Sequence, residues 1–227
     1  MIPDETLEDA ARAVYARYAA EIVEAFDFCP WARRAREDDQ VRIEVISEQT
    51  PTLAQTLAVS DQLAARDETA IGLLLFPRVQ WSRGAWQRFV ADLHTLDAAS
   101  VRPLQKVFAA AAFHPSAEAV VEDPRRLVAF VRRTPDPTIQ LVRHEVLQRV
   151  RSKDPPETLF VDAKQIETYL QNITVNPPAR PIAERIAQAN RATVVTQGVE
   201  HIEALLRDIL RERNTRYQPH GVPERTV

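Results

Sequence analysis

Glycine is almost absent from this chain. Only four of its 227 residues are glycine, at positions 72, 84, 198 and 221. Neither a Gly-x-Gly pair nor a Gly-x-x-x-x-Gly-Lys-Ser/Thr segment can be written from these positions, so glycine-rich phosphate-binding loops are excluded. The Gly-x-Ser-x-Gly elbow is missing as well, which leaves a serine hydrolase of that type without support.

Cysteine occurs once, as Cys29, which excludes an internal disulfide and a Cys-x-x-Cys pair. The five histidines show no His-x-x-x-His or His-Glu-x-x-His spacing, so we expect no metal site, and nothing in the pattern indicates a cofactor. The first ten residues are acidic, unlike a signal peptide, and no apolar run is long enough to span a bilayer. We therefore expect a cytoplasmic protein with no membrane partner.

The chain also lacks an excess of positive charge. With 29 basic and 32 acidic residues its net charge is −3, and nucleic acid is not an expected partner. Residues 122–153 nevertheless carry eight basic and four acidic side chains, a local charge of +4. This segregation favours a small anionic molecule as the partner.

Apolar residues make up 45% of the sequence and charged residues 27%, which is typical of a soluble globular domain. Residues 41–47 alternate between apolar and charged side chains, the pattern of a half-exposed strand. Continuous apolar runs over 70–76 and 106–113 predict two buried strands. Helical spacing between these runs predicts an α/β fold with a small, mainly parallel sheet flanked by helices, followed by additional C-terminal helices.

Two segments begin with the same pattern, an aspartate followed by a proline, which is typical of a helix start. Asp123-Pro124 opens one predicted helix, and Asp136-Pro137 opens another with Ile139 and Val142 on its apolar face. We predict one domain over residues 1–213, with an inserted lobe at about 152–179. Residues 214–227 are expected to form a flexible C-terminal tail.

Cys29 is the first candidate site residue. If Pro30 begins a helix, the sulfur faces unpaired backbone N–H groups, and Arg33 and Arg34 follow closely. This placement favours the thiolate and lowers the pKa of Cys29, as a nucleophile requires. The alternative is a buried, inert cysteine packed between Phe28 and Trp31.

His114 follows the predicted strand 106–113, at the kind of strand end where ligands collect in α/β sheets. It is a candidate acid or base, and the alternative is a histidine that caps the strand through a backbone hydrogen bond. Arg133 and Arg143 flank a proline-rich loop and the predicted helix, a suitable place to bind carboxylate or phosphate. Asp136 and Thr138 complete the candidate ligand-binding set.

The residues around these candidates resemble those of a bacterial family of uncharacterised proteins, the domain of unknown function numbered 1415. The resemblance rests on segments 28–32 (Phe-Cys-Pro-Trp-Ala), 112–115 (Ala-Phe-His-Pro) and 132–144, which occur in the family's order. It implies that Cys29, His114, Arg133 and Arg143 occupy the family's characteristic positions, and it implies no particular reaction.

Several residues depart from the family's pattern. Ser116, Ala117 and Glu118 stand where the family has Tyr-Gln-Phe after its His-Pro. Arg132, Asp136 and Gln140 stand where the family's segment has asparagine, tyrosine and histidine. If the family's asparagine or histidine takes part in chemistry, this chain is expected to bind a ligand without transforming it.

These observations favour one polar pocket, built from Cys29, His114, Arg133 and Arg143, that handles a small anionic molecule. In an enzymatic version Cys29 is the nucleophile or redox thiol and His114 is the acid or base. Two alternatives stay open: a non-catalytic module that binds a nucleotide or metabolite, and a protein-interaction scaffold that uses the inserted lobe.

Overall fold

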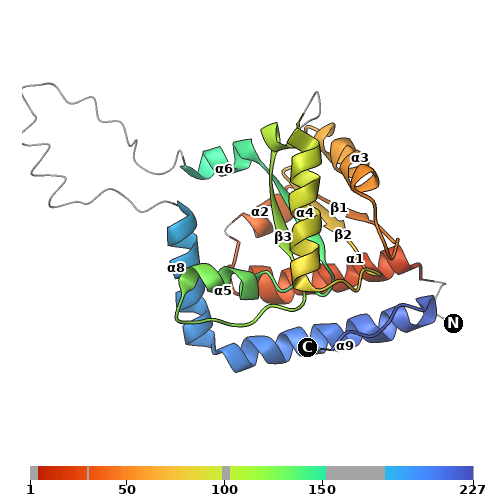
Figure 1. Cartoon of the computed structure of the whole chain (residues 1–227). Helices are drawn as coiled ribbons and strands as arrows, with labels where there is room; N and C mark the ends of the chain where they lie inside the picture. The colour runs from red at the N-terminus through yellow and green to blue at the C-terminus, as the bar shows by residue number, and fades with distance from the viewer. Residues whose placement is uncertain (1–4, 30, 99–102, 152–181, 227) are drawn as a thin grey trace, which may run out of the picture.

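The computed structural model describes residues 5–29, 31–98, 103–151 and 182–226. In this part of the chain a four-stranded sheet lies between two layers of helices (Figure 1). The prediction of an α/β fold with additional C-terminal helices is confirmed. In spatial order the strands are β1 (Val41–Val45), β2 (Ile71–Leu75), β4 (Thr138–Arg143) and β3 (Phe108–Phe113).

The sheet is mixed, whereas the sequence predicted a mainly parallel one. β1 and β2 are parallel, but β4 runs antiparallel to both of its neighbours, β2 and β3. The three strands predicted from the sequence are all present. The topology differs because a fourth strand lies between two of them.

That fourth strand corrects the helix predicted after Asp136-Pro137, since residues 138–143 form β4 and a helix begins only at α6 (His144–Arg151). Ile139 and Leu141 belong to the core on one face of the sheet. Gln140 and Val142 face the other side. A strand covered on both faces shows no apolar–polar alternation, so its short apolar run could not be distinguished from a helix.

One face of the sheet is covered by α3 (Leu53–Ala64) and α4 (Arg83–Ala98). Trp86 lies at the centre of this core. Gly72 permits the close packing of α3, because a Cβ atom there would lie only 3.0 Å from Leu63 Cδ1. Ser82 caps α4: its hydroxyl oxygen accepts a 3.3 Å hydrogen bond from the N–H of Ala85.

The opposite face is covered by a larger group of helices. α1 and α9 lie side by side across it, and α5 packs against α8 (Figure 1). Gly198, between α8 and α9, has a φ of 85°, a conformation that favours glycine. No described helix is both long and apolar enough to cross a membrane. The helices of this face are α1 (Leu7–Tyr18), the π-helix η1 (Ala19–Glu24), α5 (Pro124–Val131), α8 (Ile182–Gln197) and α9 (Val199–Tyr217).

Residues 214–226, in the segment for which the sequence favours a flexible tail, form defined structure and contact the core. α9 continues to Tyr217, a 3-10 turn follows at η4 (Gln218–His220), and Val222 is buried in the core. Asn214 holds the last segment through two hydrogen bonds to the backbone of Arg225. The predicted lobe at 152–179 lies outside the described residues.

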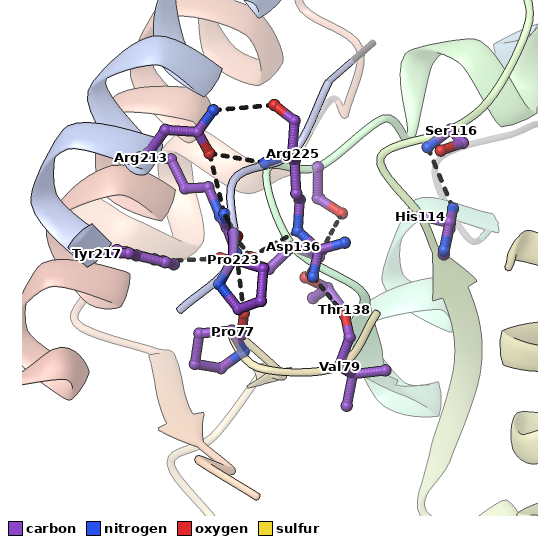
Figure 2. Close-up of polar contacts among 12 residues, drawn as sticks. Pro77, Val79, His114, Ser116, Asp136, Thr138, Arg213, Tyr217, Pro223 and Arg225 are labelled. Atoms are coloured by element: carbon purple, nitrogen blue, oxygen red, sulfur yellow. Dashed lines mark hydrogen bonds and ion pairs between the residues drawn. The ribbon is translucent and has the colours of Figure 1, made fainter. Parts of the chain in front are cut away.

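One buried carboxylate fastens this C-terminal segment to the sheet (Figure 2). Asp136 Oδ1 accepts a 3.0 Å hydrogen bond from Arg213 and lies 3.4 Å from Nε of Arg225, while Oδ2 accepts a 2.7 Å bond from the Tyr217 hydroxyl. Arg213 is 0% and Asp136 4% exposed. Two further N–H groups of Arg213 bond the carbonyls of Pro77 and Pro223. Removing one partner from a buried group of paired charges leaves an unpaired buried charge, which strongly destabilises the fold.

We expect Asp136→Ala to lower the free energy of unfolding by about 3–5 kcal/mol, because two buried guanidinium groups lose their counter-ion. Tyr217→Phe removes a single hydrogen bond to the carboxylate and should cost about 1.5–3 kcal/mol. The control is Asp38→Ala, whose partner Arg34 is exposed and which should cost less than about 1 kcal/mol. Urea unfolding measures all three, and an Asp136→Ala loss no larger than that of the control would contradict the account.

Candidate functional site

A cavity of about 660 Å³ lies between the sheet and the helices of the α1 face. Its floor includes Ala109 and Ala111 of β3, whose short side chains leave room that larger residues would fill. Tyr18 and η1 form part of its roof, and α5 and α8 contribute the side walls. Most of the lining is apolar, so the few polar groups in it determine what the cavity can bind.

Among the described residues, two arginines line this cavity, and Arg36 is paired with Glu24 whereas Arg132 is not. The guanidinium carbon of Arg132 lies 5.3 Å from the centre of the Phe113 ring, in cation–π contact. Within the described ranges Arg132 makes no side-chain hydrogen bond and no ion pair. Burial lowers the pKa of Arg132, although an arginine stays protonated in proteins. The cavity therefore contains a largely desolvated positive charge that has no counter-ion among the described residues.

Two further polar groups on the lining also lack partners. The Nε1–H of Trp31 is buried and has no acceptor. The Gln140 amide, on the sheet floor, makes no hydrogen bond among the described residues. By contrast, the two carboxylates on the lining are already paired, Glu24 with Arg36 and Asp39 with Arg42. The cavity thus contains unpaired donors and no unpaired carboxylate in the described chain.

Cys29 lines the same cavity, but its environment differs from the prediction. The backbone N–H groups of Trp31 and Ala32 do point at the sulfur, as expected. Burial outweighs them and raises the pKa of Cys29 to about 11. Arg33 and Arg34 do not help the thiolate, because they pair with Glu24 and Asp38. The expectation of a lowered pKa is therefore wrong.

His114 caps the end of β3. Its Nδ1 accepts a 3.1 Å bond from the backbone N–H of Ser116 (Figure 2), and its Nε2 lies 3.1 Å from the carbonyl oxygen of Trp81. This pattern assigns a neutral ring protonated at Nε2. Burial, with Arg225 and Arg83 nearby, lowers the pKa of His114. Both ring nitrogens serve the backbone, so the capping alternative describes this residue.

The four residues expected in one pocket do not meet. His114 lines a second, smaller hollow, on the other side of Arg132 from Cys29. Phe113 pairs with Thr138 and Phe108 with Arg143, so His114 and Arg143 lie at opposite ends of one ladder. Five residues of strand separate those ends by roughly 17 Å.

The remaining candidates are held in structural contacts. Arg133 bonds the carbonyl of Pro115 at 3.0 Å and Glu203 at 3.2 Å. Arg143 bonds the backbone carbonyl of Thr69 at 2.9 Å and stacks on Phe108. The Thr138 hydroxyl bonds the carbonyl of Asp136, whose carboxylate is paired as described above. No group of three or more His, Cys, Asp and Glu that could hold a metal ion occurs among the described residues.

Sequence reasoning missed Arg132, Gln140 and Trp31 as site residues. A signal for Gln140 was present, because it is the one polar side chain in the middle of the apolar segment 139–142. This signal has no meaning if the segment forms a helix, because only in a strand do Gln140 and Val142 face the same side. Arg132 adjoins Arg133 in the sequence, and only the end of α5 determines which of the two faces the cavity.

Comparison with protein families shows one match. The model described as "Protein of unknown function (DUF1415)" matches residues 11–169. This is more than half of the chain, and the chain therefore belongs to that family, which confirms the resemblance seen in the sequence. Comparisons with curated proteins and with solved structures found no significant match.

The alkylation rate of Cys29 tests its environment. In the folded protein we expect the rate with iodoacetamide to keep rising well above pH 8.5, since the pKa of the thiol is about 11. In urea the same thiol should titrate near its ordinary value of about 8.5. Cys29 is the only cysteine, so no other thiol interferes. A plateau at or below the ordinary value in the folded protein would contradict the account.

The lowered pKa of His114 predicts a pH-dependent stability. The folded protein disfavours the protonated ring, so the free energy of unfolding should fall as the pH drops below about 6.5, the ordinary pKa of histidine. His114→Asn keeps an acceptor for the Ser116 N–H but cannot titrate, and it should flatten this dependence. His94→Asn is the matched control. Equal slopes for His114→Asn and the wild type in urea titrations between about pH 5 and 7 would contradict the prediction.

Proposed function

We propose that this protein binds a small organic anion with a mainly apolar body in the cavity between the sheet and the helices of the α1 face. The observation that carries the proposal is the largely buried, unpaired guanidinium of Arg132 on an otherwise apolar wall. A buried charge without a partner is costly, and an anionic group of a ligand would remove that cost.

The size and lining of the cavity fit such a ligand. Its volume of about 660 Å³ lies within the range of about 300–1,000 Å³ that is common for small-molecule sites. Aromatic and alanine side chains offer apolar contact to the body of the ligand. The amide of Gln140 offers a donor that is unused in the described chain. Polar groups inside proteins are nearly always satisfied, so this amide and the unpaired Arg132 favour a polar ligand group there.

Binding is a better account than catalysis by Cys29 and His114. The raised pKa of Cys29 leaves little thiolate at neutral pH. His114 has both ring nitrogens engaged by backbone groups and lines a different hollow. An acid–base pair must reach the reacting atoms within hydrogen-bond distance, and these two side chains share no such position. The non-catalytic alternative is therefore favoured over the enzymatic one.

Two fluorescent probes with nearly the same apolar body test the role of Arg132. 1-Anilinonaphthalene-8-sulfonate carries a negative charge, and N-phenyl-1-naphthylamine does not. Losing a charge-assisted hydrogen bond costs about 1.5–3 kcal/mol. Arg132→Met should therefore lower the affinity for the charged probe by roughly tenfold to a hundredfold. Binding of the neutral probe should be nearly unchanged.

Controls separate this effect from a loss of structure. Arg126→Met removes an exposed arginine from α5, the helix that ends directly before Arg132, and it should leave the binding of both probes unaffected. Arg132→Lys keeps the charge without the guanidinium fork and should recover part of the affinity. The proposal is wrong if Arg132→Met weakens both probes equally while the protein stays folded, or if it weakens neither.

A further inference from the structure

A second hollow, of about 210 Å³, lies at the edge strand β3, between the first turns of α4 and the end of α5. Arg83 and Gln87 contribute from α4, and His114 from the end of β3. Val128 and Arg132 of the α5 segment line this pocket and also the larger cavity, so the two hollows share a wall. Nothing in the proposed function uses this smaller pocket.

Among the residues that the structure describes, the pocket lining carries positive charge and no carboxylate. It contains Arg83 and Arg132. Arg83 is half-buried and, in the described part of the chain, forms neither a side-chain hydrogen bond nor an ion pair. Trp86, which is 0% exposed, forms part of the pocket wall. Two arginines that line one hollow without an acidic partner in the described chain require an explanation, and a bound anion supplies one.

We propose that this pocket is a binding site for a phosphate-class oxyanion, held by Arg83 and Arg132. The guanidinium fork matches the paired oxygens of a phosphate. The first turn of the 16-residue helix α4 places Arg83 where the positive end of the helix also favours an anion. The neutral His114 ring, fixed by its backbone bonds, adds an uncharged wall.

The volume agrees with this class of ligand. A hollow of about 210 Å³ has room for a tetrahedral oxyanion and a few waters, each of which takes about 30 Å³ in the liquid. It is too small for the apolar body assigned to the larger cavity. Two sources can supply the oxyanion: free phosphate, or a phosphate group on the ligand that occupies the larger cavity. The NMR titrations described next distinguish these two sources.

The three tryptophans provide separate reporters. Trp86 lines the small pocket, Trp31 lines the large cavity, and Trp81 lines neither. Their indole N–H resonances can be followed in ¹H–¹⁵N spectra of the full chain, with Trp86→Phe to assign the key one. Titration with inorganic phosphate should move the Trp86 resonance saturably and leave Trp31 in place, while sodium chloride of equal ionic strength should not move it.

Matched variants test which arginine matters. Arg83→Gln should weaken phosphate binding by roughly tenfold, the loss expected for one charge-assisted contact. Arg88→Gln removes an exposed arginine of the same helix that does not line the pocket, and it should match the wild type. Because Arg132 lines this pocket as well as the larger cavity, Arg132→Met should also weaken the binding of phosphate.

Hexyl phosphate distinguishes the two sources of the oxyanion. If it moves Trp86 and Trp31 along one saturation curve, the phosphate is the end of the cavity's ligand. If Trp86 alone moves, the pocket takes a separate anion. The proposal is overturned if neither phosphate compound moves Trp86, or if Arg83→Gln binds like the wild type. The probe experiment on Arg132 is independent of both results, so this site can fail while the organic-anion site stands.

Discussion

The buried carboxylate of Asp136 is the interaction on which the rest of the structure depends. It lies in the loop between α5 and β4, and it pairs with Arg213, Arg225 and Tyr217 from the C-terminal part of the chain. Because the loop is fixed, the end of α5 and the start of β4 are fixed with it. Arg132 directly follows α5 and Gln140 belongs to β4, so the positions of both side chains depend on a contact that lies outside the cavity.

The cavity itself results from a balance between packing and function. A strand of alanines, where larger residues would fill the core, leaves an apolar hollow, and empty apolar space has a cost in stability. The unpaired groups around it, above all Arg132, add a second cost. Both features are explained if a ligand with an apolar body and an anionic group occupies the space. A protein that only binds this ligand needs no reactive thiol or imidazole. This agrees with the raised pKa of Cys29 and with the two ring nitrogens of His114 that are engaged by the backbone.

Much of the fold could be predicted from the sequence, but the site only in part. The continuous apolar runs 70–76 and 106–113 predicted β2 and β3, because a buried strand requires several consecutive apolar residues. β4 was assigned to a helix, since the signal at Asp136-Pro137 is common to helix starts and tight loops. Its aspartate turned out to anchor residues some eighty positions away. Long-range pairs such as Asp136–Arg213, and the choice of Arg132 over Arg133 as the cavity cation, leave no local pattern to read.

The central claim is that Arg132 is a ligand-binding cation and that the cavity beside it accepts the body of an organic anion. A crystal structure of the protein with saturating octanoate tests this most directly. The account predicts a carboxylate at about 2.7–2.9 Å from the Arg132 guanidinium, the usual length of such a bond, with the alkyl chain lying over Ala109 and Ala111. A structure in which octanoate binds elsewhere, and Arg132 is paired with a carboxylate of the protein itself, would contradict it.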